Sequence, residues 1–305
     1  MNTTSSTFKA NALYNVQSNN AVRPASEHSF SVAIIPRSQA AFISPLLDEV
    51  SKLAPQEIIL FNSRLVPQGN IPIRNIWLNN EVSSGQLVNI AIEEAKSKFV
   101  LVLWSDMRFL GAISLNVFLR IEERSNLCVT PQLFNAEGLK LPCLSAPAFD
   151  SNGFSIILDM NEQNETQVFL PLDFAGAYNR SRFLNLGGYD NTISNSYWQR
   201  ADFAMRSAMW GERIVLNPAL TITYNADHNA IEEEDSFGLS TLIFALKNLG
   251  VSINKNRVTL PFWRMLWLNG TRGKLTLFNE IKEWVHHNRL RFRYNAEQVV
   301  DNWQG

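Results

Sequence analysis

The sequence predicts an α/β fold: a mostly parallel central sheet flanked by helices, followed by a helical C-terminal extension. Two observations carry this prediction. Short apolar runs of strand length alternate with amphipathic helical patterns, an order typical of parallel sheets with helices on both faces. The run at 99–104, Phe-Val-Leu-Val-Leu-Trp, is apolar throughout. An unbroken apolar run is typical of a strand buried on both faces.

The first half of the chain supplies most of the expected strands, at residues 30–35, 57–61, 73–78, 99–104 and 127–134. Between them, helical spacing predicts amphipathic helices. Their apolar positions are Leu46, Leu47, Val50 and Leu53 in the first, Leu87, Ile90, Ala91 and Ala95 in the second, and Leu115, Phe118 and Leu119 in the third. The pattern weakens from 142 to 166, where we expect loops and irregular strands.

The second half continues with a turn that contains paired glycines, Leu186-Gly-Gly-Tyr-Asp190. A helix is expected to begin at Tyr197 and to end before Gly211, because glycine is typical of the position after a helix end. Short strands are expected at 213–216 and 221–224, and further helices at 240–249 and 277–293.

Composition limits the function classes. The chain has 305 residues and a formal net charge of −1, so no overall field favours nucleic acid and we expect no nucleic-acid partner. The two cysteines, Cys128 and Cys143, predict no disulfide framework and a reducing compartment. No secretion signal is visible and no segment has the ~20 apolar residues that span a bilayer. We therefore expect a cytoplasmic protein.

Three regions are expected along the chain. Residues 1–28 offer little apolar surface to offset the entropy of ordering and are expected to form a disordered tail. Residues 29–235 contain the alternating strands and helices and are expected to form the α/β domain. Residues 236–305 are expected to form the helical extension.

Asp106 is the first candidate for chemistry, because it follows the buried strand at 99–104. In open parallel sheets, ligands bind beyond the carboxyl ends of the strands. A carboxylate at this position is suited to hold a divalent cation against a diphosphate. A capping or turn aspartate explains the same position equally well, and the sequence leaves both interpretations open.

The order of the motifs resembles that of family-2 glycosyltransferases, which have the Rossmann-like GT-A fold. Asn89 stands where such proteins carry a characteristic helical asparagine, and Trp104-Ser105-Asp106 stands where they carry Asp-x-Asp. Residues 187–190, Gly-Gly-Tyr-Asp, resemble the family's Gly-Gly-aromatic-Asp turn. The later helix, strand and histidine of the family are matched by Tyr197–Arg206, Arg213–Pro218 and His228. The resemblance covers about residues 30–230 and rests on the order of the motifs.

The resemblance implies a hexosyltransferase-like enzyme of polysaccharide biosynthesis, with a nucleotide-sugar donor and a glycan or lipid-linked acceptor. It also implies a divalent metal, Mn²⁺ or Mg²⁺, held across the diphosphate by Asp106 and His228. A surface-loop histidine is the alternative for His228. The donor-binding residues expected on this basis are Pro36, Arg37, Asn89, Ser105, Asp106 and Arg200.

Two positions depart from the family pattern. Trp104 replaces the first acid of Asp-x-Asp, and indole cannot accept a hydrogen bond. Stacking of Trp104 on a ring is one interpretation, and core packing is the favoured one. Gln199 and Arg200 replace the Glu-Asp pair that supplies the base in inverting members. A guanidinium cannot accept a proton, although it can neutralise a diphosphate.

The missing base leaves three hypotheses open. Asp202 or Asp190 serves as the general base of an inverting enzyme, or the leaving phosphate accepts the proton in a retaining mechanism, or the chain is an inactive binding or scaffold subunit. Structural roles compete with catalysis at both acids. Asp202 precedes Arg206 by four residues, which favours a helical ion pair, and Asp190 lies in a turn.

The C-terminal segment combines aromatic and basic residues, most densely in Pro-Phe-Trp-Arg-Met-Leu-Trp at 261–267. Such a composition suits the surface of an anionic membrane, so peripheral contact with the inner face of the membrane is one hypothesis. The favoured alternative is a helical appendage on the acceptor side, with Trp263, Trp267 and Trp284 packed inside.

Overall fold

The computed structural model describes residues 14–18, 30–37, 43–63, 72–111, 117, 121, 126–151, 153–160, 166–225, 238–254, 257–268, 270 and 272–303. Leu115, Phe118 and Leu119, the apolar positions of the third expected helix, lie outside these residues. No helix within them is long and apolar enough to cross a membrane.

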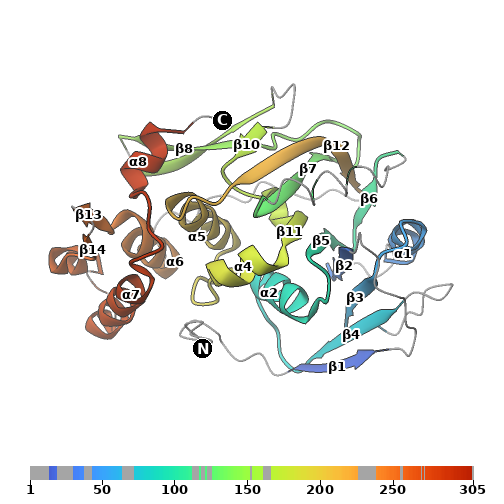
Figure 1. The fold of residues 1–305 in the computed structure, drawn as a ribbon, viewed down its shortest axis with the longest axis horizontal. Helices are drawn as coiled ribbons and strands as arrows, with labels where there is room; N and C mark the ends of the chain where they lie inside the picture. Colours follow the sequence, from blue (N-terminus) through green and yellow to red (C-terminus); the bar gives the residue numbers. More distant parts are fainter. Residues whose placement is uncertain are drawn as a thin grey trace.

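A ten-stranded sheet runs through the molecule in the order β1-β4-β3-β2-β5-β11-β7-β12-β10, and β6 pairs with β12 (Figure 1). Its strands are β1 (Tyr14–Ser18), β2 (Phe30–Ile35), β3 (Glu57–Phe61), β4 (Ile73–Leu78), β5 (Phe99–Trp104), β6 (Met107–Phe109), β7 (Cys128–Phe134), β10 (Thr166–Val168), β11 (Gly176–Asn179) and β12 (Ile214–Tyr224).

Six of these described strands point the same way. β4, β3, β2 and β5 are hydrogen-bonded in parallel, and β12 is parallel to β7. Because β11 is antiparallel to both β5 and β7, the strands β5 and β7 share one direction. The predicted mostly parallel sheet is therefore confirmed, and every residue of β2, β3 and β5 is buried, as their apolar runs predict.

The helices that cover the sheet are α1 (Ile43–Lys52), α2 (Ser84–Glu94), α4 (Arg180–Leu186) and α5 (Ser196–Met209). α2 contacts both α4 and α5, and the three lie beside one another in Figure 1. Asparagine or serine side chains cap α2, α4 and α5: Ser83, Asn179 and Asn195 each accept a hydrogen bond from a backbone amide of the first turn.

The structure corrects three sequence-based expectations. Residues 14–18, assigned to a disordered tail, form β1 and pair with β4 along their whole length. The two strands expected at 213–216 and 221–224 form one strand, β12, whose register with β7 shifts between Asn217 and Thr221. The region expected to contain irregular strands holds a regular hairpin of β8 (Leu144–Asp150) and β9 (Gly153–Asp159).

The C-terminal segment forms helical elements, as predicted, at the end of the molecule opposite α1 (Figure 1). They are α6 (Leu239–Phe244), the π-helical turn η4 (Ala245–Leu249), the 3₁₀ segment η5 (Phe262–Leu268), α7 (Lys274–Asn288) and α8 (Ala296–Asp301), with a small hairpin of β13 (Ser252–Asn254) and β14 (Arg257–Thr259). α6, η4 and α8 all contact α5. The boundary at 235/236 stays a prediction.

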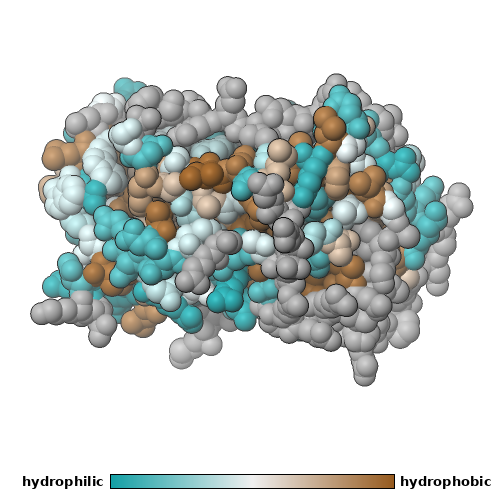
Figure 2. Space-filling model, turned by 90° about the horizontal axis from the view of Figure 1, so that it is seen from above, coloured by the Kyte–Doolittle hydropathy of each residue, from teal (hydrophilic) through white to brown (hydrophobic). Residues whose placement is uncertain are grey.

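The three tryptophans expected inside this segment differ in burial. Trp284 is buried and stacks on Trp210, with their ring centroids 6.0 Å apart. Trp267 is partly buried, whereas Trp263 is 55% exposed, which corrects its expected packing. On the face drawn in Figure 2, apolar residues reach the surface in separate groups among polar ones.

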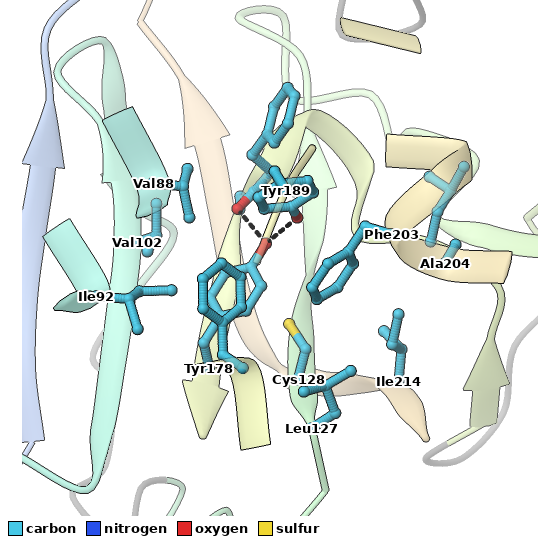
Figure 3. Close-up of a cluster of buried hydrophobic side chains, with 14 of the residues drawn as sticks. Val88, Ile92, Val102, Leu127, Cys128, Tyr178, Tyr189, Phe203, Ala204 and Ile214 are labelled. Carbon is cyan, nitrogen blue, oxygen red and sulfur yellow. Dashed lines mark hydrogen bonds between the residues drawn. The ribbon is translucent and has the colours of Figure 1, made fainter. Parts of the chain in front are cut away.

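A buried aromatic cluster lies where α5 covers the sheet (Figure 3). Tyr189 stacks on Phe203 with 4.4 Å between ring centroids, and Tyr178 packs against both. The Tyr178 hydroxyl donates to Phe174 O at 2.8 Å and is 2.7 Å from the Tyr189 hydroxyl (Figure 3). Since Tyr178 has one hydroxyl proton, Tyr189 donates to it. Burial raises the pKa of both tyrosines, so both keep their protons at neutral pH.

Candidate functional site

The loops that follow β2 and β5 meet at the carboxyl edge of the sheet. The two strands are parallel neighbours, with Ile35 paired to Trp104. Ser105 N donates to Ile35 O at 2.8 Å, and Arg37 N donates to Ser105 Oγ at 2.9 Å. The structure thus brings together three predicted donor-site residues: Arg37, Ser105 and Asp106. Pro36 lies between Ile35 and Arg37 and is partly buried.

The Arg37 guanidinium joins two carboxylates at this edge. Its Nη2 lies 2.7 Å from Asp173 Oδ2, and its Nη1 lies 3.5 Å from Asp106 Oδ2. It also lies over the Trp104 ring, 4.2 Å from the centroid, a cation–π geometry. Trp104 is buried, as predicted, and it supports Arg37. We call Arg37, Trp104, Asp106, Asp173 and Tyr224 the edge cluster.

Asp173 lies in an unusual backbone turn, η3 (Leu172–Phe174), directly before β11. Asp173 and Phe174 both have positive φ, at 50° and 58°, a conformation that costs about 1–3 kcal/mol at each non-glycine residue. Two hydrogen bonds hold the turn: Trp104 Nε1 donates to Asp173 O at 2.6 Å, and the Tyr178 hydroxyl donates to Phe174 O. The buried aromatic cluster thereby fixes the position of the Asp173 carboxylate.

Tyr224, at the end of β12, completes the edge cluster. Its hydroxyl donates to Asp173 Oδ2 at 2.6 Å. Burial, and next the Asp173 carboxylate, raise the pKa of Tyr224, so the phenol stays protonated and acts as a donor. The sequence interpretation missed Asp173 and Tyr224. A local signal existed for Asp173, an acid inside the apolar stretch Phe169-Leu-Pro-Leu-Asp-Phe174.

Asn89 has a structural role in this structure, and its predicted contact with the donor stays a prediction. Its Nδ2 donates to Tyr189 O at 2.8 Å, and its Oδ1 accepts from Tyr189 N at 2.8 Å. The side chain therefore fastens α2 to the Gly-Gly-Tyr-Asp turn. Gln199 adds a second link, because its Oε1 accepts from Gly85 N and its Nε2 donates to Asp190 O.

Asp190 and Asp202 lie in a buried ion cluster with Lys247, which the sequence interpretation missed. Lys247 Nζ lies 2.7 Å from Asp190 Oδ2 and 3.2 Å from Asp202 Oδ1. Asp202 also pairs with Arg206 at 2.7 Å and accepts a hydrogen bond from Asn248 at 2.9 Å. Their side chains are at most 2% exposed, so an acceptor hydroxyl does not reach either carboxylate in this structure. The predicted role of Asp202 or Asp190 as the general base stays a prediction, and in this structure both carboxylates are engaged with Lys247.

The charges around Asp202 set its protonation. Burial by itself raises the pKa of this carboxyl, but the positive charges of Arg206 and Lys247 outweigh burial and hold the pKa below its ordinary value. The carboxylate is consequently ionised at neutral pH and serves as a counter-charge. The ion pair with Arg206, predicted from the four-residue spacing, is confirmed.

Arg200 is also buried, at 2% exposure, with its guanidinium 5.5 Å from the centroid of the Phe174 ring. It thus lies next to the turn that carries Asp173. His228, the other predicted metal ligand, lies outside the described residues.

The edge cluster fits a divalent metal poorly in this arrangement. Asp106 and Asp173 offer carboxylate oxygens, which such ions prefer, but the Arg37 guanidinium already lies between them. Among the described residues, no group of three or more His, Cys, Asp or Glu side chains is placed to hold a metal ion. The chain's own cation balances one of the two negative charges.

Comparisons with known proteins identify the fold. No family model matches the sequence, and no curated protein matches it. A crystal structure of GalNAc-T7 with UDP, GalNAc and Mn²⁺ matches 91% of this chain with a TM-score of 0.63 and 11% identity. S. aureus TarS 1–349 in complex with UDP-GlcNAc matches 85% of the chain, and 72% of its own, with a TM-score of 0.50 and 12% identity.

This chain spans 57% of the length of the GalNAc-T7 chain that it matches. Both neighbours are GT-A-type glycosyltransferases, and their mixed sheets flanked by helices correspond to the architecture described above. At 11–12% identity the likeness concerns the fold. The chain therefore has a GT-A-type fold, as the order of its sequence motifs implies.

Proposed function

We propose that this chain is a glycosyltransferase that binds a nucleotide-sugar donor at the carboxyl edge of its sheet. The observation that supports this proposal most strongly is the hydrogen bonding between the loops after β2 and β5, which brings Arg37, Ser105 and Asp106 together. Ligands of such sheets bind at this edge. UDP and UDP-GlcNAc in the neighbours' crystal structures support a UDP-sugar as the donor.

Catalysis in this proposal does not use Asp202 or Asp190, since both carboxylates are engaged in the buried ion cluster. The mechanism that remains is one in which the acceptor proton passes to the donor's leaving phosphate. Arg37 is the partly exposed cation of the edge cluster and is suited to pair with the charge that develops on that phosphate. A divalent ion, Mn²⁺ or Mg²⁺, belongs to this proposal as an ion that arrives with the donor.

Calorimetric titration of the purified chain with UDP-GlcNAc, UDP-GalNAc and GDP-mannose, with and without Mn²⁺, tests donor binding. We expect a UDP-sugar to bind and Asp106→Asn to weaken binding by at least ten-fold. Asp301→Asn, an exposed acid on α8, is the matched control and is expected to bind like the wild type. The proposal is wrong if no donor binds, or if Asp106→Asn binds the donor as tightly as the wild type does.

A donor-binding subunit without transferase activity is the second candidate. It is favoured by Gln199 and Arg200, which are both buried where the resemblance places the Glu-Asp pair. Release of free UDP from a bound donor, followed with and without candidate glycan acceptors, separates the two functions. Turnover that Asp106→Asn abolishes supports the enzyme, whereas tight donor binding without turnover supports the subunit.

We also propose that η5 contacts the inner face of a membrane and that this membrane carries a lipid-linked acceptor. Phe262, Trp263 and Leu266 are 61%, 55% and 63% exposed, and the Arg264 guanidinium lies 4.0 Å from the Trp263 ring centroid. Exposed aromatic residues beside a cation suit an anionic lipid surface. We expect co-sedimentation with phosphatidylglycerol vesicles, lost in Trp263→Glu and kept in the control Leu290→Glu, which changes a residue that is 91% exposed outside η5. Equal sedimentation of both variants would contradict the contact.

A further inference from the structure

The Arg37 guanidinium is the most exposed charged group of the edge cluster. The Arg37 side chain is 17% exposed, whereas those of Asp106 and Asp173 are each 8% exposed. An ion that approaches the two carboxylates from solvent therefore meets a positive charge first.

The charges at this edge do not balance. Asp106 and Asp173 contribute two negative charges and Arg37 contributes one positive charge, a local sum of −1. A small cation is attracted to the two carboxylates, but it must displace the guanidinium or lie beside it. At such short range in a partly buried site, repulsion between the two cations is strong.

The attachment of Arg37 allows its charge to move while its backbone stays in place. The backbone amide donates to Ser105 Oγ, which fixes the start of the side chain. The guanidinium is held by the Trp104 ring and by the 2.7 Å ion pair with Asp173. A diphosphate offers the guanidinium an alternative bidentate partner of higher charge than a carboxylate.

We propose that Arg37 is the resident cation of the Asp106–Asp173 pair and excludes a free divalent cation until a nucleoside diphosphate draws the guanidinium away. The second part rests on the proposed function, because the diphosphate is that of the donor. The first part concerns the chain alone. Metal binding is in this way coupled to donor binding, and Arg37 determines the order in which the two occur.

Mn²⁺ alone is the probe for the first part. Its free concentration is followed by electron paramagnetic resonance at pH 8. We expect Arg37→Met to bind Mn²⁺ at least ten-fold more tightly than the wild type. Arg37→Lys keeps the positive charge and is expected to bind as weakly as the wild type. Arg37→Met combined with Asp106→Asn, or with Asp173→Asn, is expected to lose the gain.

Two results overturn the inference: Arg37→Met binds Mn²⁺ no better than the wild type, or its gain survives when Asp106→Asn or Asp173→Asn is added. Circular dichroism establishes that each variant is folded. Should Arg37→Met not fold, Arg37→Gln removes the charge while keeping an amide donor and is measured in its place. The second part predicts that UDP raises the Mn²⁺ affinity of the wild type by at least ten-fold and that of Arg37→Met by less. Equal enhancement in both overturns that part.

Failure of the proposed function gives a different result. If no nucleotide or nucleotide-sugar binds any variant while Arg37→Met still gains Mn²⁺ affinity, Arg37 remains the resident cation and the donor site is wrong. If donors bind but Arg37→Met gains nothing, the donor site remains and the role of Arg37 is wrong.

Discussion

The Lys247 ammonium lies 2.7 Å from the Asp190 carboxylate, and this ion pair joins η4 of the C-terminal segment to the Gly-Gly-Tyr-Asp turn. The same ammonium lies 3.2 Å from Asp202 in α5 and 4.5 Å from the centroid of the Trp284 ring in α7. One buried lysine thus connects four parts of the fold. The C-terminal segment consequently contributes to the stability of the GT-A-type sheet and helices.

Lys247→Met is expected to lower the free energy of unfolding by about 3–5 kcal/mol, because it leaves two buried carboxylates without their shared cation. Urea denaturation followed by tryptophan fluorescence measures the change. Lys282→Met, which replaces an exposed lysine on α7, is the control and is expected to change stability by less than about 0.5 kcal/mol. Similar effects of the two substitutions would show that the ion cluster does not stabilise the fold.

Asp202→Asn is expected to reduce stability at pH 7 and to flatten its acid dependence. Arg206 and Lys247 hold the pKa of Asp202 below its ordinary value, so the unfolded chain, with an aspartate pKa of about 3.9, binds the proton more readily. The stabilisation is therefore present above about pH 4 and is lost as the pH falls through the lower, folded-state pKa. Unfolding free energies of both proteins from pH 7 to pH 3 provide the measurement. A difference that stays constant over this range contradicts the assignment.

Gly188→Ala is expected to destabilise the chain more than Gly187→Ala. Both glycines have positive φ, 67° and 91°, so each alanine incurs a backbone cost of about 1–2 kcal/mol. At position 188 the added Cβ would also lie 2.4 Å from Asn89 Oδ1, whereas at 187 it meets nothing within 4 Å. The two melting temperatures separate the backbone cost from the clash. Equal melting temperatures would mean that Asn89 moves aside freely.

Trp104→Phe is expected to weaken both the fold and donor binding. The substitution removes the indole N–H that donates a hydrogen bond to Asp173 O, and it removes part of the ring surface on which Arg37 lies. Together these losses are expected to lower the free energy of unfolding by about 1–3 kcal/mol. The control is Trp210→Phe, since the indole nitrogen of Trp210 has no hydrogen-bond partner among the described residues. Denaturation and donor titration of both variants are compared. Unchanged donor affinity in Trp104→Phe would separate the Asp173 turn from the donor site.

The sequence by itself determined where the buried strands lie and where two of them end. An unbroken apolar run of strand length indicates a buried strand, because a strand covered on both faces has no position that favours a polar residue. The places of Arg37, Ser105 and Asp106 followed from those strand ends, and the Asp202–Arg206 pair followed from helical spacing. These are relations between residues close in the chain.

Only the tertiary structure decided which charges from distant parts of the chain meet. Arg37 pairs with Asp173, 136 residues away, and Lys247 reaches Asp202 across 45 residues. Such contacts depend on which strands neighbour each other and how the C-terminal helices pack on α5, and sequence spacing carries no information on either. The degree of burial depends on the same packing: the Asp106 side chain, at the edge of the sheet, is 8% exposed, whereas the Asp202 side chain, which contacts Lys247 of η4, is fully buried. Asp202, which the family resemblance offers as a general base, is in this structure a buried counter-charge, because packing encloses it with Arg206 and Lys247.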